Sequence, residues 1–218
     1  MNPGTVARRL TGALRLVAGL GLAVTMAIQI GERVAKDIFD PWEYFSYFTI
    51  ETSLLNIVVL VMGGLMALRR PVDTVLYTTV RMAAVAYAIV TAGVFNLLLR
   101  DAPSAAASPT LEWPNEVMHV WIPAFIVLDW LLAPGRPALP WKALRVIAVY
   151  PVAWLVYTLA RGALSGGEIY PYPFIDPATA GWGSVIVYIV ALTAVLLVLG
   201  ALAIAYGRIG RRRPVSTA

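Results

Sequence analysis

Residues 183–206 read GSVIVYIVALTAVLLVLGALAIAY, a stretch without any charged side chain. A helix crosses the roughly 30 Å hydrocarbon core of a bilayer with about 20 predominantly apolar residues. A helix also satisfies its backbone hydrogen bonds internally, as the interior of a bilayer requires. This stretch therefore predicts a transmembrane helix and an integral membrane protein.

Five other stretches have the length and apolar character of a span, although the fourth in chain order is the least obvious by hydropathy. The chain is 60% hydrophobic and 13% charged, with a mean hydropathy of +0.76, and is thus more apolar than soluble domains. Because the connections are short, we expect an all-α polytopic membrane protein in which residues 1–218 form a single domain, a bundle of six transmembrane helices. The other spans are predicted at approximately 11–30, 45–68, 75–99, 115–133 and 142–160.

The composition excludes several kinds of site. Cysteine is absent and there is a single histidine, which excludes disulfides, thiolate chemistry, a multi-histidine metal site and a haem with two histidine ligands. The acidic residues form no ligand-spaced cluster, so we expect neither a metal nor another cofactor. The net charge of +5 does not indicate nucleic-acid binding, because the basic residues lie at the ends of apolar stretches and not along one polar face. Nothing in the sequence indicates an oligomeric state.

Lys and Arg residues are distributed unequally between the two sides of the predicted bundle. Thirteen of the 17 lie near one set of span ends, and such residues are enriched in cytoplasmic loops. We therefore expect a cell-membrane protein with cytoplasmic N- and C-termini, whose loops near 31–44, 100–114 and 161–182 face outward. Residues 25–27 loosely resemble a signal-peptide cleavage site, but we interpret the first stretch as a retained span. The four basic residues on the outer side are Arg33, Lys36, Arg100 and Arg161.

Polar residues of the second span gather on one helical face. Separations of three, four and seven residues return a helix to nearly the same direction, so this face should point into the bundle. It can serve either helix-to-helix hydrogen bonding, a common use of Ser, Thr and Asn in membranes, or a functional site. Glu51 projects at about 200° from Thr49 by the 3.6-residue period, toward outer water. The face comprises Thr49, Thr52, Ser53 and Asn56.

The fourth span carries a second polar group near its outer end. Asn115, Glu116 and His119 have spacings that place them on adjacent parts of one face. An ionisable group inside a membrane is a functional candidate, although a buried histidine can also be purely structural. Thr49 lies at a similar depth within the second span, so Thr49 and His119 can meet in one outward-opening layer.

Other polar residues end spans or pair within the membrane. Asn96 and Arg100 end the third span on the outer side, and Arg161 ends the fifth. The two arginines are either interfacial anchors or partners of a carboxylate or an anionic lipid head group. Toward the cytoplasm, Arg81 and Asp129 lie at comparable depth, and we predict a structural ion pair.

The outer segment 170–177 reads YPYPFIDP. Its prolines fix the backbone and remove hydrogen-bond donors, so the segment is stiff as well as aromatic. It serves either as a lid over the polar layer, with Tyr172 and Asp176 as supporting residues, or as an interfacial belt.

With these residues in view, the chain resembles the androgen-induced and androgen-dependent membrane protein family, and more closely its bacterial six-span relatives. The resemblance extends over nearly the whole chain, and it implies that Thr49 is a nucleophile and His119 its partner, because the studied animal members are threonine hydrolases of branched fatty-acid esters. After Thr49 the chain departs from the animal pattern, with Ile-Glu-Thr at 50–52. The resemblance rests on three sequence motifs: FSYFTIETSLLN at 45–56, NEVMH at 115–119 followed by Pro123, and YPFID at 172–176.

The chemistry agrees with this resemblance. A threonine hydroxyl needs a neighbouring base, and His119 is the side chain suited to shuttle protons near neutral pH. We therefore expect a membrane-embedded hydrolase of lipid esters that draws its fatty-acid ester substrate from the bilayer. The alternative is a lipid-binding or transport protein in which the same polar layer forms no covalent intermediate. In the hydrolase, Asn115 or Glu116 would orient the imidazole, and Asn56 or Asn96 would donate to the oxyanion.

Overall fold

The computed structural model describes residues 3–100, 111–166 and 170–209, and these ranges contain helices and no strand. Six helical segments are long and apolar enough to cross a membrane, which confirms the prediction of an all-α, multi-pass membrane protein. The elements in chain order are α1 (Pro3–Ala35), α2 (Pro41–Tyr44), α3 (Phe48–Arg69), α4 (Val75–Val94), the π-helical turn η1 (Phe95–Leu99), α6 (Trp113–Glu116), the π-helical turn η2 (Val117–Trp121), α7 (Ile122–Leu132), the 3-10 turn η3 (Trp141–Arg145), α8 (Val146–Leu164), the 3-10 turn η4 (Pro173–Ile175) and α9 (Pro177–Arg208).

The first and last helices are longer than their predicted spans of 11–30 and 183–206, because hydropathy marks only the part of a helix that crosses hydrocarbon. In α9 the added residues include a first turn that precedes a kink at Gly181, whose φ of 75° is not helical. The start of α9 is determined by capping. The Asp176 carboxylate accepts a hydrogen bond from the amide of Ala178 at 2.8 Å, and Pro177 occupies the first helical position, where a missing N–H costs nothing. Asp176 and Pro177 lie before the apolar stretch 183–206, so hydropathy alone does not indicate where α9 begins.

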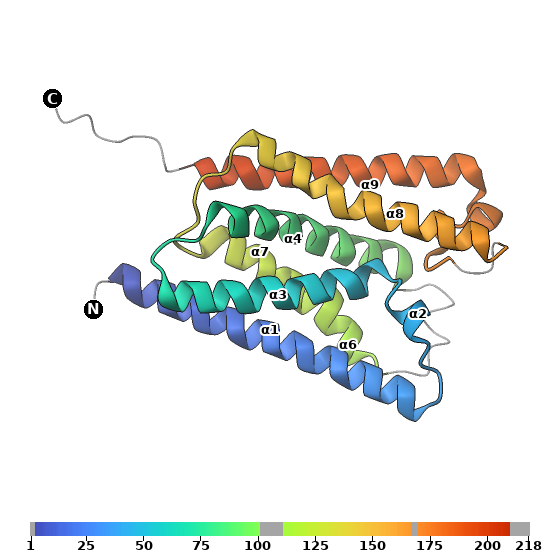
Figure 1. Ribbon diagram of the computed structural model, residues 1–218, viewed down its shortest axis with the longest axis horizontal. Coiled ribbons are helices and arrows are strands. Elements are labelled where there is room, and N and C mark those ends of the chain that lie inside the picture. The colour runs from blue at the N-terminus through green and yellow to red at the C-terminus, as the bar shows by residue number, and fades with distance from the viewer. Residues whose placement is uncertain (1–2, 101–110, 167–169, 210–218) are drawn as a thin grey trace.

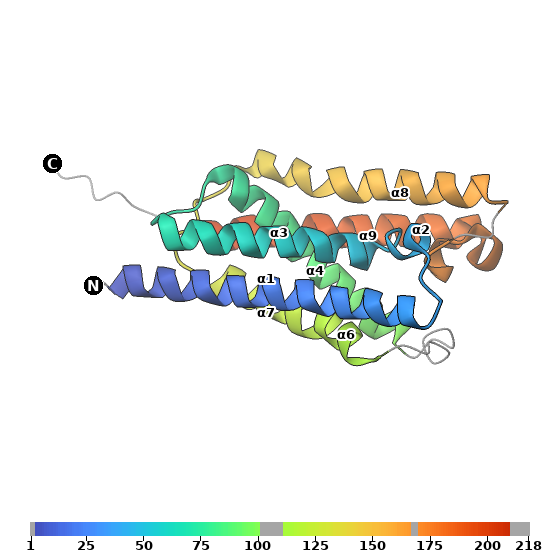
Figure 2. The ribbon, with the colours of Figure 1, turned by 60° about the horizontal axis from the view of Figure 1, so that its bottom comes forward.

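Helix α4 is the centre of the bundle, packing against α3, α7, α8 and α9. Its side chains Met82, Ala86 and Tyr87 are almost completely buried. Helix α1 lies beside α3, and α8 lies with α9 on the far side of α4 (Figures 1 and 2). The start of α1 and the end of α9 lie together at one end of the bundle, which we call the terminal end; the opposite end is the site end (Figure 1).

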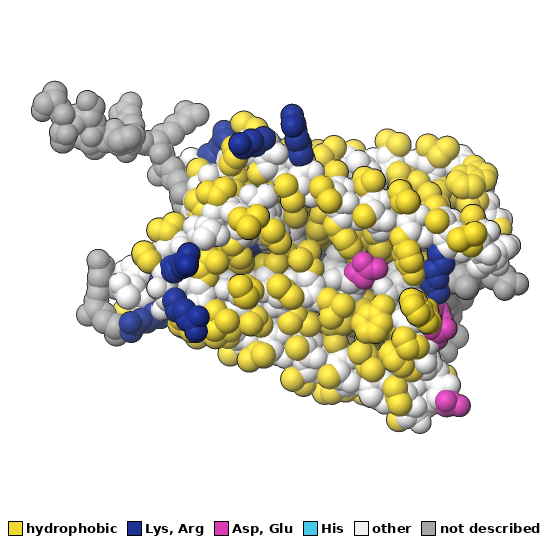
Figure 3. Space-filling model, in the orientation of Figure 1, with side chains coloured by type: hydrophobic (Ala, Val, Ile, Leu, Met, Phe, Trp, Pro, Cys, Tyr) yellow, Lys and Arg dark blue, Asp and Glu magenta, His cyan; other side chains and the backbone are white. Residues whose placement is uncertain are grey.

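The surface between the two ends is apolar. Hydrophobic side chains cover most of the face drawn in Figure 3, and Lys and Arg gather mainly at the terminal end. Large apolar side chains such as Val17, Val58 and Val187 are exposed in the isolated chain, and a soluble protein rarely exposes a continuous surface of this kind. Lipid would cover them in a bilayer.

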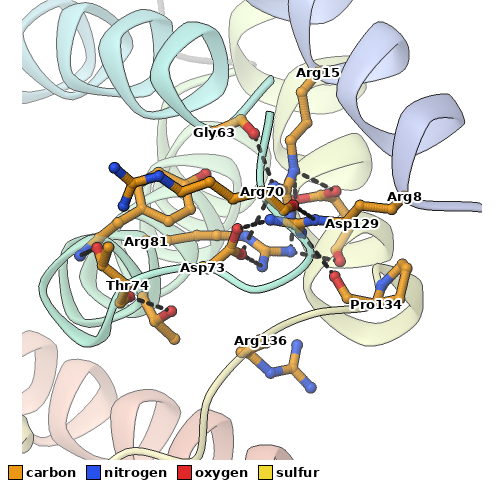
Figure 4. A network of polar contacts seen from close by, with 12 residues as sticks. Arg8, Arg15, Gly63, Arg70, Asp73, Thr74, Arg81, Asp129, Pro134 and Arg136 are labelled. Carbon is orange, nitrogen blue, oxygen red and sulfur yellow. Dashed lines mark hydrogen bonds and ion pairs between the residues drawn. The ribbon is translucent and has the colours of Figure 1, made fainter. Parts of the chain in front are cut away.

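A buried ion cluster joins the helices at the terminal end (Figure 4). The predicted pair is present: the Arg81 guanidinium lies 2.6 Å from the Asp129 carboxylate. Arg15 from α1 also contacts Asp129, at 2.9 Å, and Arg8 is paired with Asp73 in the connection between α3 and α4. Because these side chains are almost fully buried, the cluster fastens α1, α4 and α7 to one another.

Candidate active site

Thr49 is the second residue of α3, at the site end of the bundle. Tyr47 precedes the helix as its N-cap residue and provides no side-chain cap. Thr49 is partly buried and lines a cavity. The next polar residues of its face, Thr52, Ser53 and Asn56, are buried, as predicted.

His119 lies in the middle of the π-helical turn η2, and Pro123 explains part of this local geometry. A proline has no N–H, so the carbonyl of the residue four positions earlier loses its helical partner. That carbonyl belongs to His119, and the Asn96 side-chain amide lies 3.4 Å from it. Phe95, at the start of the π-helical turn η1, stacks on the imidazole with a centroid distance of 3.8 Å and an angle of 17°. The two facing π-helical turns thus hold His119, and such turns occur frequently at functional sites.

The structure brings Thr49 and His119 together. Nε2 of His119 lies 3.3 Å from Oγ1 of Thr49, and Nδ1 lies 2.8 Å from the main-chain oxygen of Asn115. A carbonyl oxygen can only accept, so this contact assigns the proton to Nδ1 of the neutral ring. Nε2 then presents its lone pair to the Thr49 hydroxyl, the orientation that a general base for this hydroxyl requires.

Thr49 is one of the residues that line an apolar cavity of about 730 Å³, counted out to its mouth. Its walls come from α4, α8, α9 and the 170–176 segment. Thr91 and Thr193 are among its few polar lining residues, and Tyr172 lines it together with Thr49. The apolar wall includes Val90, Leu99, Trp154, Leu155, Ile189 and Leu196.

The side chains of Asn115 and Glu116 form no hydrogen bond with the His119 imidazole, which one of them was expected to orient. Asn115 orients His119 through its main-chain oxygen. Glu116 instead forms an ion pair with Arg100, with contacts of 2.6 and 3.1 Å. This pair joins the end of η1 to α6 and so braces the two π-helical turns.

Neither asparagine expected to donate to an oxyanion is placed to do so. The Asn96 amide lies 2.8 Å from the carbonyl of Ala92 and 3.4 Å from that of His119, so it faces main-chain oxygens. Asn56 is buried and does not line the cavity. It lies almost two turns of α3 beyond Thr49, because the residues between them rise by about 1.5 Å each.

Several other predicted residues have structural roles. The Thr52 hydroxyl donates to the carbonyl of Phe48 at 2.7 Å, within the first turn of α3. Ser53 is buried without lining the cavity. The Thr179 hydroxyl lowers the pKa of Asp176, which caps α9. Arg161 lies within electrostatic range of Tyr47 at the site end.

Glu51, which was expected to project toward outer water, is partly exposed and also contacts a neighbouring helix. Its carboxylate accepts a hydrogen bond of 3.0 Å from the Tyr150 hydroxyl. Tyr150 belongs to α8. The helical period gives the direction of Glu51 on α3, but it does not predict which helix packs there. Glu51 therefore links two helices beside the cavity.

Residues that the sequence analysis missed extend the site toward α1. The Tyr44 hydroxyl donates to the side-chain oxygen of Gln29 at 2.7 Å, and the Gln29 amide lies 3.3 Å from the Asn115 side-chain oxygen. Burial raises the pKa of Tyr44 to about 12, so its hydroxyl remains a donor. Gln29 is a single amide side chain in an apolar span. Its isolation is the feature of the sequence that could have indicated a buried polar contact.

For the ester hydrolysis expected from the sequence, Asn115→Ala should lower the rate by less than about tenfold, well short of the 10²–10⁴ supplied by a general base. The reason is that the alanine retains the main-chain oxygen that receives His119. Steady-state rates of Asn115→Ala and His119→Ala, measured side by side, check this expectation. Equal losses in the two variants would mean that the Asn115 side chain, and not its carbonyl, supports the base.

Comparison of the chain with family models, with curated proteins and with solved structures finds no match. Among the described residues, no group of three or more His, Cys, Asp or Glu side chains is arranged to hold a metal ion. The Thr49–His119 pair and the adjoining cavity are therefore the features from which function is inferred.

Proposed function

We propose that this protein is a membrane-embedded hydrolase of lipid esters, with Thr49 as nucleophile and His119 as general base. The observation that carries the proposal is the 3.3 Å separation of Thr49 Oγ1 from His119 Nε2, in a ring whose Nδ1 is held by Asn115. A nucleophile, a base within reach and a group that orients the base form the usual arrangement for covalent catalysis. The resemblance to the threonine hydrolases named above supports the same roles.

The reaction follows from these positions. Thr49 Oγ1 attacks the ester carbonyl carbon and its proton passes to Nε2 of His119. The bond between this carbon and the alcohol oxygen then breaks, and the leaving alcohol takes the proton from His119. Water attacks the resulting acyl-threonine with His119 again as base, which releases the fatty acid and restores the Thr49 hydroxyl.

The cavity supports a lipid as the substrate. Its lining is predominantly apolar and includes Thr49, and sites of this kind use a few polar groups to orient a largely hydrophobic ligand. An acyl chain would lie between α4, α8 and α9 with its ester group at Thr49. The substrate would enter from the bilayer.

Labelling by a serine- and threonine-reactive fluorophosphonate tests the proposal. The purified protein should be modified at Thr49, as identified by peptide mapping, because an activated hydroxyl attacks the phosphorus centre. Thr49→Ala should lose the label, whereas the matched variant Thr52→Ala should keep it, because the Thr52 hydroxyl bonds a helical carbonyl.

The apolar cavity also fits the alternative, a lipid-binding or transport protein without covalent chemistry. In that case the wild-type protein would retain a lipid but show no label on Thr49, and Thr49→Ala would bind the same lipid. Labelling of Thr49 would exclude this alternative as the sole function of the site.

We further propose that the terminal end faces the cytoplasm, because thirteen of 17 Lys and Arg residues belong to that side. Reporter fusions at residue 105, which lies outside the described residues, and at the C-terminus should lie on opposite sides of the cell membrane. The C-terminal reporter should be cytoplasmic. Two reporters on the same side would contradict this topology.

A further inference from the structure

The hydroxyl of Tyr172 lies at the start of α3, beside Thr49. The Thr49 amide N–H points to it at 3.5 Å, and the Phe48 amide and the Thr49 side chain also lie close enough to lower the pKa of this hydroxyl. These amides belong to the first turn of a helix, where N–H groups lack helical partners. Tyr47 does not cap them with its side chain, so the Tyr172 oxygen marks the point to which they converge.

The surrounding rings fix this position. Tyr172 is buried, stacks on Phe174 with a centroid distance of 5.2 Å and meets the edge of Tyr47 at 5.7 Å. Tyr170 packs so closely on α8 that a Cβ at Gly162 would overlap its ring. The ring of Tyr172 is therefore held by packing, and its hydroxyl is left to serve the site.

An oxyanion would form beside this point of convergence. When Oγ1 of Thr49 bonds to an ester carbonyl carbon, an electron pair of the C=O bond moves onto the carbonyl oxygen, one bond from the new C–O link. Hydrogen-bond donors fixed at such a point act more strongly on the transition state than on the ground state. The positive end of the α3 dipole adds to this effect.

Resting on the proposed ester hydrolysis, we propose that the Tyr172 hydroxyl and the Thr49 amide N–H form the oxyanion hole. Without substrate, the Thr49 amide N–H points to the Tyr172 oxygen. As the bond to the substrate forms, the new oxyanion takes this N–H and accepts a second hydrogen bond from the Tyr172 hydroxyl. When the tetrahedral intermediate collapses and the alcohol leaves, the electron pair returns to the carbonyl and this hydrogen bond weakens.

The protonation state of Tyr172 suits this role. Burial raises the pKa of Tyr172 to about 12, outweighing the hydrogen bonds from Thr49 and Phe48, which lower it. The hydroxyl therefore keeps its hydrogen, and remains a donor, throughout the physiological pH range.

Tyr172→Phe tests the assignment, because it removes the hydroxyl and keeps the packed ring. Loss of one oxyanion donor lowers kcat by about 10²–10³-fold, and we expect this loss with little change in KM. The matched control is Tyr170→Phe, in the same segment, which should retain wild-type kcat.

A second readout separates catalysis from packing. Sulfur accepts hydrogen bonds poorly, so the wild-type enzyme should hydrolyse an ester much faster than its thionoester, in which sulfur replaces the carbonyl oxygen. In Tyr172→Phe this ratio should fall by at least about tenfold, in keeping with the loss of one oxyanion donor. An unchanged ratio together with wild-type kcat would overturn the role of Tyr172 while leaving Thr49-dependent hydrolysis intact. A wild-type protein that hydrolyses no ester would overturn the proposed function and this assignment together.

Discussion

Thr49→Ala and His119→Ala should each lower hydrolysis of a fatty-acid ester by on the order of 10⁴-fold or more, as in other hydrolases that lose a nucleophile or its base. Thr49→Ala removes the oxygen that forms the acyl-enzyme, and His119→Ala removes the group that takes its proton. Both variants should remain membrane-inserted. Steady-state assays of purified protein, with a check of helical content, measure this result.

Two further variants show whether Thr49 and His119 act together in one catalytic step or contribute independently to the rate. The double variant should be little slower than either single one, because loss of one partner already disables the shared step. Thr49→Ser keeps a hydroxyl and should keep part of the activity, although loss of the methyl group loosens its rotamer. Full activity in Thr49→Ala would exclude the covalent mechanism.

Asp129→Ala should destabilise the fold by about 3–5 kcal/mol, the usual cost of removing one partner from a buried ion cluster. Asp129 receives both Arg15 and Arg81, so the substitution leaves two buried guanidinium groups without their closest carboxylate. Denaturant or thermal unfolding in detergent would measure the loss.

The matched control is the exposed pair formed by Lys36 and Glu32, whose charged atoms lie 2.7 Å apart one helical turn from each other. Lys36→Gln should change stability by less than about 1 kcal/mol, because water screens exposed pairs. Under conditions where Asp129→Ala remains folded, it should still be labelled at Thr49, which lies at the other end of the bundle. A small effect of Asp129→Ala on unfolding would contradict the structural role of the cluster.

The sequence was sufficient to predict the six spans, because each span needs an apolar stretch long enough to cross hydrocarbon. It also predicted the meeting of Thr49 and His119, since both lie at similar depth on polar faces. The pairing of Arg81 with Asp129 followed from depth as well. The depth of a residue in the membrane does not show which helices are neighbours in the bundle, however. The additional contacts of Arg15 and Arg8 were therefore not predicted.

Details of the site depended on local geometry that helical spacing does not contain. The spacing of residues 115–119 describes an ideal α-helix, whereas the π-helical turn η2 rotates the side chains within it. The group that orients His119 is a main-chain carbonyl, which any residue at position 115 would provide, so side-chain chemistry gave no signal for it. The place of Tyr172 depends on the path of a connecting segment across the end of α3, which no periodic pattern describes.

Trapping the acyl-enzyme tests the central claim most directly. The purified protein is mixed with a p-nitrophenyl fatty-acid ester, quenched within the first turnover and examined by intact-mass measurement and peptide mapping. We predict a burst of p-nitrophenol equivalent to the amount of protein and one acyl group attached to Thr49. Release of p-nitrophenol without a burst or adduct, or an acyl group on another residue, would contradict Thr49 as the nucleophile.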